Sequence, residues 1–336
     1  MAVKSSMRDV AMRAAVSIGT VSNVLNHPQV VAPATRARVE RAIADLGFVP
    51  SAPARQLRSG RAQVIGLVVP DIANPFFTEV ARGVEDAALA AGFVVILCNS
   101  DERADREDRY LGVLEAQRVG AVLITPARRG DQALQRLIDS GAAVALLDNE
   151  QPREDVCSAA VDDARGGRLA AQHLIDLGHR TLLWLAGPGD IPQVADRETG
   201  LLAAAEAAGV QVTRVVADQM SANAGARAIE QLLPDRLAAT AIVCANDLLA
   251  LGAIRSLTRA GLVVPGDVSV IGYDDIEFAA DAAVPLSSVR QPKYELGYAA
   301  ARLVIEECAN PTAHAHQRVQ FQPQLVVRES TGPAPS

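Results

Sequence analysis

Residues 15–26 read AVSIGTVSNVLN, and this stretch decides how the first part of the chain folds. Ser17 is a preferred N-cap residue for a helix. Three apolar residues follow it at the i, i+3, i+4 spacing of a buried helix face: Val21, Val24 and Leu25. The stretch therefore predicts a short helix that begins after Ser17 and keeps its other face exposed.

A helix is predicted on each side of this one. Ser6 and Asp9 have the spacing of a capping box and predict a helix that ends near Ala14. A third helix is predicted over 33–46, because proline suits its first position and Gly47 suits its end. Two short helices joined by a tight turn form a helix-turn-helix, and three helices make a minimal all-α domain.

The charge of the chain is distributed unevenly. The 336 residues are 49% hydrophobic, enough for two or three domains, and this length excludes a peptide hormone. The net charge of −7 alone argues against a nucleic-acid partner. Residues 1–61, however, hold nine basic and three acidic side chains, a local charge of +6, so the remainder carries −13. A basic head precedes an acidic body.

The sequence contains no recognisable metal, export or membrane signal. Its four cysteines lie far apart, without the Cys/His spacing of a zinc site, so we expect reduced, mostly buried thiols and no metal site. The N-terminus lacks the apolar stretch of a signal peptide, and no segment is long and apolar enough to span a membrane. We expect a soluble, cytoplasmic protein.

Residues 9–11 and 15–26 resemble, almost position for position, the DNA-binding head of the lactose and galactose repressor (LacI/GalR) family. The resemblance implies that Ile18, Gly19 and Asn23 meet base edges in the major groove. An Asn side chain offers the donor and acceptor that match adenine, and Ile18 can contact a thymine methyl. The resemblance further implies that Thr20, Ser22 and Asn26 hold phosphates. The implied DNA-binding residues of the helix are Ser17, Ile18, Gly19, Thr20, Ser22, Asn23 and Asn26.

Two positions of the head depart from the family pattern. Many members carry Arg where this chain has Asn23, so its DNA half-site is expected to differ at that base. Ala15 replaces the usual glycine of the turn, and we expect this replacement to cost little.

Residues 50–61 read PSAPARQLRSGR, a composition that alone would describe a flexible basic linker. In the family this stretch is a hinge helix that folds when a dimer binds DNA and inserts a leucine into the minor groove. The resemblance gives that role to Leu57, with the linker as the alternative. Pro53 is tolerated near the first turn after a Ser51 cap.

From residue 62 onward, short β-rich runs alternate with helical stretches, which indicates parallel sheets built from βα units. The predicted strands are 64–69, 94–98, 121–125, 144–147, 182–185, 212–216, 241–244 and 268–271. Their grouping predicts two similar lobes with a break near 156–163. A helix over 294–307 and a strand over 318–327 are expected to return across the lobes.

Polar residues follow most of these strands, and open α/β sheets bind ligands at the carboxyl ends of their strands. Each polar residue alone is best read as a helix cap or turn residue, but together they predict a ring around a crevice. Residues 65–77, 177–180, 245–247 and 270–275 resemble the family's sensor domain, which is related to periplasmic sugar-binding proteins. The implied effector contacts are Phe76, Phe77, Asp148, Arg197, Met220, Asn246, Asp274 and Gln291.

Carboxylates, amides and a guanidinium around an aromatic face suit a polyhydroxyl ring. Met220 stands where members often place an aromatic side chain, so a sugar is favoured while a nucleoside or a phosphorylated metabolite stays open. His179, at a predicted helix end, is expected to close a turn.

The domains expected are 1–49 for DNA binding, 50–61 as hinge or linker and 62–336 for effector binding and dimerisation. A transporter's solute-binding protein would need export. An enzyme would need a nucleophile, a metal cluster or a paired acid and base, and the crevice residues show no recognisable Ser/His/Asp order or metal spacing. The sequence therefore predicts a DNA-binding transcriptional regulator, a repressor without catalysis or cofactor. We expect a homodimer that reads a pseudo-palindromic operator, with affinity controlled by a small-molecule effector.

Overall fold

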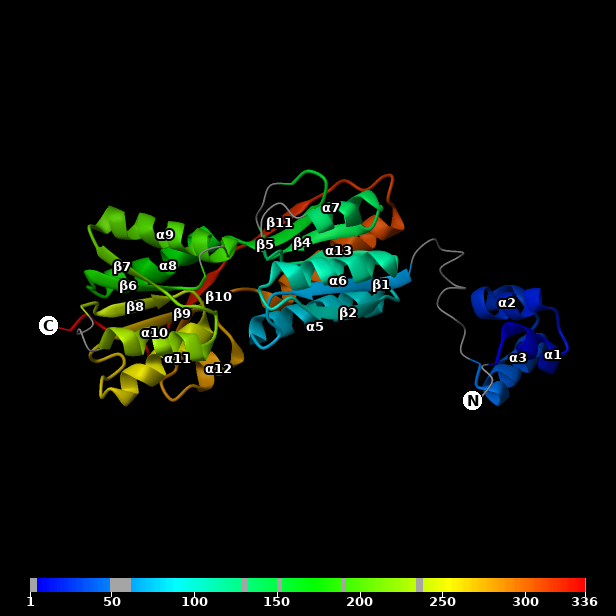
Figure 1. The fold of residues 1–336 in the computed structure, drawn as a ribbon, viewed down its shortest axis with the longest axis horizontal. Coiled ribbons are helices and arrows are strands. Elements are labelled where there is room, and N and C mark those ends of the chain that lie inside the picture. The colour runs from blue at the N-terminus through cyan, green and yellow to red at the C-terminus, as the bar shows by residue number, and fades with distance from the viewer. Residues whose placement is uncertain are drawn as a thin grey trace. The chain divides into compact units, whose positions relative to one another are not determined.

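The computed structural model describes residues 5–48, 62–127, 132–149, 153–188, 191–233 and 238–335. The chain divides into two compact units, Met1–Ala62 and Gln63–Ser336. Figure 1 shows an all-α first unit and an α/β second unit. We call the first unit the head and the second the body.

The head contains helices α1 (Met7–Ala14), α2 (Ile18–Asn26) and α3 (Pro33–Leu46), with a short 3-10 helix, η1 (Pro28–Val30), after α2. The predicted caps are confirmed: Ser6 and Asp9 form a capping box, Ser17 caps α2, and Gly47 ends α3 with a left-handed φ of 55°. The buried core of the head consists of Val10, Ala11, Ala14, Val21, Val24, Val39, Ala42 and Phe48.

Ala15 is more strained than the sequence suggests. It ends α1 in the left-handed conformation, with φ 50° and ψ 51°. A non-glycine residue there brings its Cβ close to the following carbonyl oxygen, which costs roughly 1–2 kcal/mol. The expectation that alanine costs little at this position was therefore wrong.

The body begins with a lobe built on a six-stranded sheet of order β11-β5-β4-β3-β1-β2. Helices α5 and α13 pack against each other on one face, and α6 and α7 cover the other. The strands are β1 (Ala62–Val69), β2 (Val94–Asn99), β3 (Val119–Ile124), β4 (Ala143–Leu147), β5 (Cys157–Val161) and β11 (Arg318–Phe321). The helices are α5 (Pro75–Ala90), α6 (Ala104–Ala116), α7 (Gln132–Asp139) and α13 (Lys293–Ala309). We call this part lobe 1.

Lobe 2 repeats the plan with a sheet of order β12-β10-β9-β8-β6-β7. Helix α8 pairs with α9 and α10 with α11, while β12 alone runs antiparallel to its neighbour β10. The strands are β6 (Thr181–Ala186), β7 (Gln211–Val216), β8 (Ala241–Cys244), β9 (Ser269–Asp274), β10 (Ser287–Arg290) and β12 (Gln324–Val326). The helices are α8 (Asp163–Asp176), α9 (Pro192–Ala208), α10 (Ala222–Leu232), α11 (Asp247–Arg259) and the short α12 (Glu277–Asp281).

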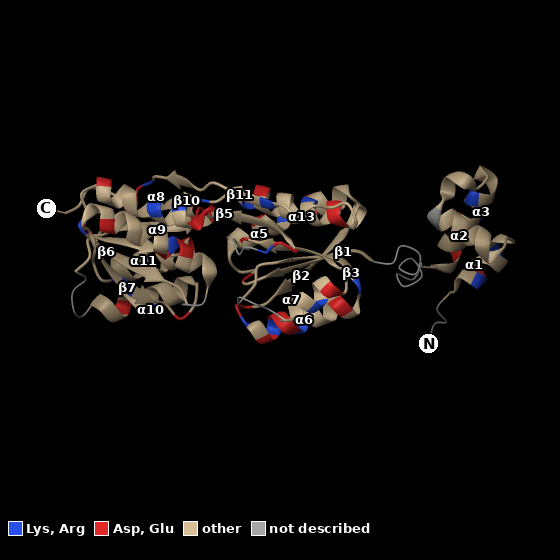
Figure 2. Ribbon diagram, turned by 90° about the horizontal axis from the view of Figure 1, so that it is seen from above, with Lys and Arg blue, Asp and Glu red and all other residues tan. Residues whose placement is uncertain are grey.

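The predicted fold class is confirmed: a helix-turn-helix head and a two-lobed α/β body with mainly parallel sheets. Figure 2 shows that charged residues lie mostly on helices and loops, and few on strands, as expected for sheets buried on both faces. None of the described helices is long and apolar enough to cross a membrane. The described cysteines carry no disulfide, and only Cys308 is not fully buried.

Three details of the predicted body were wrong. Strand β5 was not predicted, although the break expected near 156–163 does lie where β5 of lobe 1 ends at Val161 and α8 of lobe 2 begins at Asp163. The single strand expected over 318–327 is two strands, β11 in lobe 1 and β12 in lobe 2. They are separated at Pro323, which lacks the N–H that a continuous ladder requires. Strand β10 was not predicted at all.

Candidate functional site

The exposed face of α2 carries most of the residues expected to contact DNA. Ser17 caps the helix, since its Oγ accepts a hydrogen bond from the Thr20 amide at 3.0 Å and lies 2.9 Å from Thr20 Oγ1. Ile18 is 45% exposed although it is apolar. The exposed or half-exposed residues of this face are Ile18, Gly19, Ser22 and Asn23. The side chain of Asn26 and all of Leu57 lie outside the described residues.

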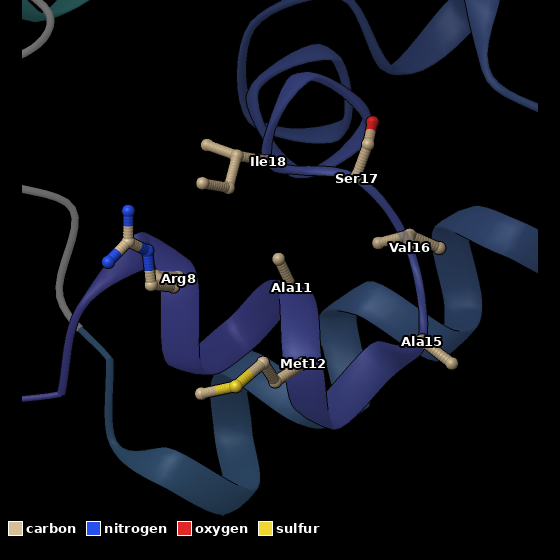
Figure 3. A pocket seen from close by; sticks show the side chains of 7 residues that line it. All are labelled: Arg8, Ala11, Met12, Ala15, Val16, Ser17 and Ile18. Carbon is tan, nitrogen blue, oxygen red and sulfur yellow. The ribbon is translucent and has the colours of Figure 1, made fainter.

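An open hollow lies between α1 and the start of α2 (Figure 3). Its lining consists of Arg8, Ala11, Met12, Ala15, Val16, Ser17 and Ile18. The Arg8 guanidinium and the Ile18 side chain reach toward the same open side (Figure 3). The N-terminus of a helix carries a partial positive charge, and Arg8 adds a full one. This side of the head is therefore suited to a phosphate backbone that flanks exposed base edges.

A second group of polar residues lies where the carboxyl ends of the two sheets meet. Asn74 caps α5, its Oδ1 accepting from the Phe76 amide at 3.0 Å. Its Nδ2 donates across the lobes to Asp274 Oδ2 at 3.4 Å, and Gln291 Nε2 donates to Asp274 Oδ1 at 2.8 Å. All three side chains are buried. Burial raises the pKa of Asp274 above its ordinary value, and the opposing effect of the Arg197 charge and these hydrogen bonds is smaller.

Arg197 is held rigidly beside this carboxylate. Its Nε donates to Asp163 Oδ1 at 2.7 Å and its Nη1 to the Ala245 carbonyl at 2.8 Å. Its guanidinium carbon lies 3.8 Å from the centre of the Tyr273 ring, and Nη1 is 3.9 Å from Asp274 Oδ1. Burial alone would lower the pKa of Arg197, but the surrounding acidic groups, Asp163 above all, outweigh it and raise the pKa. The side chain is a permanently charged, preorganised donor.

Two glycines of α8 make this arrangement possible. A Cβ on Gly166 would collide with the Tyr273 hydroxyl, and a Cβ on Gly167 would collide with the Arg197 backbone. The close crossing of α8 and α9 therefore depends on residues without a side chain.

The remaining predicted effector residues lie at the same strand ends. Phe76 and Phe77 are buried at the start of α5, with ring centres 4.9 Å apart in an edge-to-face arrangement. Asn246 caps α11, and its Nδ2 donates to the Met220 carbonyl at 3.1 Å. Asp148 follows β4, and its carbonyl accepts from the side chain of Gln193 across the lobes.

The backbone at these strand ends is strained. Asp148, Asp274 and Asp275 have positive φ values of 50°, 103° and 51°. The loop after β9 is held in place by Asp247, whose carboxylate accepts a hydrogen bond from the Ser288 hydroxyl at 2.6 Å and another from the Ile276 amide at 2.8 Å. Strained residues that a surrounding network holds in place are typical of ligand sites.

Some polar atoms here have hydrogen-bonding capacity to spare. Within the described part of the chain, no hydrogen-bond partner reaches the buried Gln291 Oε1 or the buried Thr125 Oγ1. Buried polar atoms are rarely left without a partner unless a ligand or water supplies one. These two atoms at the carboxyl ends of the sheets therefore keep hydrogen-bonding capacity that a polar ligand or a water could use.

The sequence did not single out several members of this network. Asn74 was covered by the resemblance over residues 65–77, while Asp163, Gln193 and Tyr273 were given no role. Gln193 carries no recognisable motif. Tyr273 lies within a resemblance motif at 270–275, but its role beneath Arg197 depends on contact with a helix far away in the sequence. His179, as expected, is structural: it is buried, with Nδ1 2.8 Å from Thr240 Oγ1.

Comparison with known proteins finds a match for each of the two units. Residues 6–51 match the bacterial regulatory proteins of the lacI family, and residues 171–331 match a periplasmic binding protein-like domain. The ribose operon repressor of Escherichia coli (strain K12) is 36% identical over 97% of this chain and 99% of its own.

Solved structures extend over the same length. The transcriptional regulator CelR in complex with cellobiose is 33% identical, with a TM-score of 0.72 over 97% of this chain and 100% of its own. The lac repressor dimer, solved bound to operator and the anti-inducer ONPF, is 28% identical, with a TM-score of 0.85 over 98% of this chain and 100% of its own. The chain therefore belongs to the lacI family of bacterial regulatory proteins.

Proposed function

We propose that this protein is a transcriptional repressor that binds one operator sequence. Its affinity for the operator rises or falls when a small polyhydroxyl metabolite, most simply a sugar, binds between its lobes. The observation that supports the proposal most is that one chain contains both helix α2, with an exposed face that can contact DNA, and a buried polar network that joins two lobes. Residues 1–49 are assigned to DNA binding, 50–61 to the hinge and 62–336 to effector binding and dimerisation.

The network suits hydroxyl groups. Asp274 can accept from two hydroxyls, Arg197 can donate to ring or hydroxyl oxygens, and the aromatic face of Phe76 can pack against C–H groups. Gln291 Oε1, which has no partner among the described residues, adds an acceptor. Relatives point the same way, since one is a ribose operon repressor and another was solved with cellobiose.

The same network explains how an effector would act at a distance. In the structure the lobes are joined by the Asn74–Asp274 hydrogen bond and by the bond from Gln193 to the Asp148 carbonyl. An effector that hydrogen-bonds to Asp274 would displace Asn74 from it. The effector would then bridge the two lobes in place of the direct hydrogen bond. The lobe angle that is favoured then changes, and with it the separation of the two hinges in a dimer.

A homodimer follows from the family and from the surface of lobe 1. Strand β2 forms one edge of its sheet and exposes three apolar side chains: Val94, Ile96 and Leu97. Leu89, on the neighbouring α5, is 74% exposed. A second copy that covers this face would bury these side chains and place two heads about a two-fold axis. Such a dimer reads a pseudo-palindrome, and Leu57 of each hinge would wedge between central base steps.

The proposal gives this protein no catalytic step and no cofactor, and places it in the cytoplasm with the DNA it regulates. Its test is selection of DNA from a random pool by the purified full chain at moderate salt. We expect a pseudo-palindrome with a flexible pyrimidine–purine step at its centre. If no sequence is enriched, either alone or with pools of sugars and nucleobases, the head is not a specific reader and the proposal fails.

A further inference from the structure

Four potential metal ligands meet beside the starts of strands β5 and β11 in lobe 1. Cys157 is the first residue of β5, Glu307 lies in the last turns of α13, and His314 and His316 lie in the connection from α13 to β11. One ligand atom from each side chain lies within 4.8 Å of all the others. No ligand of this group belongs to the effector network or to the head.

The distances within this group are close to those of a coordinated metal. Cys157 Sγ lies 3.1 Å from His314 Nε2 and 3.8 Å from His316 Nδ1, and His316 Nδ1 lies 4.0 Å from Glu307 Oε2. Zinc bonds of about 2.3 Å to sulfur and about 2.0–2.1 Å to nitrogen or oxygen place tetrahedral ligand atoms roughly 3.3–3.6 Å apart. Small side-chain shifts would therefore complete a tetrahedron.

The chemistry of the donors selects the class of metal. One thiolate, two imidazoles and one carboxylate suit a borderline-soft transition metal, whereas Mg²⁺ and Ca²⁺ prefer oxygen ligands alone. The Gln317 amide donates to Cys157 Sγ at 3.4 Å, the kind of surrounding hydrogen bond that supports a coordinated thiolate. His316 is exposed, and its side chain keeps 31% of its surface accessible, so an ion can enter from solvent.

We propose that Cys157, Glu307, His314 and His316 bind one divalent transition metal ion of the zinc class. The ion ties together β5, the end of α13 and the segment that leads into β11. That segment pairs with β5 from Arg318 opposite Ser158 and then crosses to lobe 2 as β12. Metal binding therefore fixes the entry to a crossing strand and stabilises the body, independently of DNA and effector.

The test uses the untagged full chain, stripped with a chelator and desalted, and then titrated with Zn²⁺ against a chromogenic chelator. We expect one tight Zn²⁺ per chain. Zn²⁺ at a hundredfold excess over its dissociation constant should raise the melting temperature of the body by about 5 °C. Co²⁺ in place of Zn²⁺ should give the near-ultraviolet charge-transfer band of a cobalt thiolate.

The variants separate a metal site from a chance cluster. Cys157→Ser should remove the cobalt thiolate band and tight Zn²⁺ binding, while Cys98→Ser, which removes a buried thiol of β2, should change neither. If Cys157→Ser does not fold, His316→Ala serves the same purpose, because this exposed side chain can be removed without opening the core. Equal Zn²⁺ binding by the wild-type chain and His316→Ala, no tight binding by the wild type, or bound Co²⁺ without the thiolate band would each overturn the proposal.

Discussion

Replacing Asp274 with Asn should separate effector binding from folding. The carboxylate is buried, accepts from Gln291 and Asn74, and lies 3.9 Å from the Arg197 guanidinium. Asn has nearly the same shape and keeps one acceptor for Gln291. It loses the charge and one acceptor that hydroxyls of an effector would use.

The substitution should change the stability of the body little and the affinity for the effector strongly. Because burial raises the pKa of Asp274, the folded protein already disfavours its charge, and a neutral Asn relieves that cost. The loss of attraction to Arg197 and the meeting of two amide donors at Asn74 act in the opposite direction, so we expect stability to change by no more than about 1 kcal/mol. A hydrogen bond from an effector hydroxyl to a charged acceptor contributes about 1.5–3 kcal/mol, so effector affinity should fall about 10- to 150-fold.

The assay begins with a thermal-shift screen of the wild-type chain against ribose, other pentoses and hexoses, cellobiose and nucleobases. Calorimetric titration with the strongest ligand then compares the wild type, Asp274→Asn and the matched control Asp281→Asn, whose carboxylate is exposed at the end of α12. Without ligand, Asp281→Asn should bind DNA as tightly as the wild type, whereas Asp274→Asn should differ from it, because the substitution removes the hydrogen bond from Asn74 that joins the lobes. Unchanged ligand affinity in Asp274→Asn would show that the effector binds elsewhere.

Other substitutions test the head, the hinge and the acid stability of the body. Ala15→Gly should stabilise the head by about 1 kcal/mol in thermal unfolding by relieving its left-handed backbone, whereas Ala37→Gly, in the exposed middle of α3, should destabilise it by about as much. Asn23→Ala should cost about 1–3 kcal/mol of discrimination at one base of each half-site, seen as relaxed preference there in a binding series of single-base variants. Leu57→Ala should weaken operator binding in a fluorescence titration and leave the melting curve unchanged; an unaltered operator affinity would refute the wedge. Burial alone would raise the pKa of Asp275, but its ion pairs with two arginines outweigh burial and lower it below 3.8. The stabilisation from this carboxylate is therefore present above pH 3.8 and lost as the pH falls through its folded pKa, so the stability difference between wild type and Asp275→Asn should vanish in acid.

Local chemistry explains why the head could be predicted. The signals of α1 and α2 lie within a few residues of the elements they specify, as the Ser6 and Ser17 caps show, and Gly47 marks the end of α3 in the same way. The left-handed conformation of Ala15 was not foreseen because the turn imposes it against the preference of the residue.

The errors in the body have a different origin. Strand β5 reads CSAAV and β10 reads SSVR, and neither has the apolar run or the alternation that predicts a strand. Their conformation is fixed by neighbouring strands, β4 and β11 for the first and β9 and β12 for the second. Whether these two segments form strands therefore depends on their neighbours in the sheet and cannot be recognised from their own residues.

The residues of the two proposed binding sites were hard to predict for the same reason, because they come from segments that are distant in the sequence. The polar strand ends predicted an effector site, but they gave no sign that Gln193 reaches the Asp148 carbonyl across the lobes from a different helix. Cys157 and His314 are 157 residues apart in the sequence, so spacing gave no reason to expect a metal site. Contacts of this range become visible only when the chain is folded.

The central claim is that a ligand bound between the lobes controls DNA binding by the head. It is tested most directly by measuring operator affinity with and without the ligand, and ligand affinity with and without the operator. Fluorescence anisotropy with the selected operator should show its affinity change about 5- to 150-fold when the screened ligand is saturating. Calorimetry in the presence of saturating operator should show the ligand's affinity change by the same factor, because coupling between two binding sites is reciprocal. A ligand that binds to the body but leaves operator affinity unchanged would contradict the account.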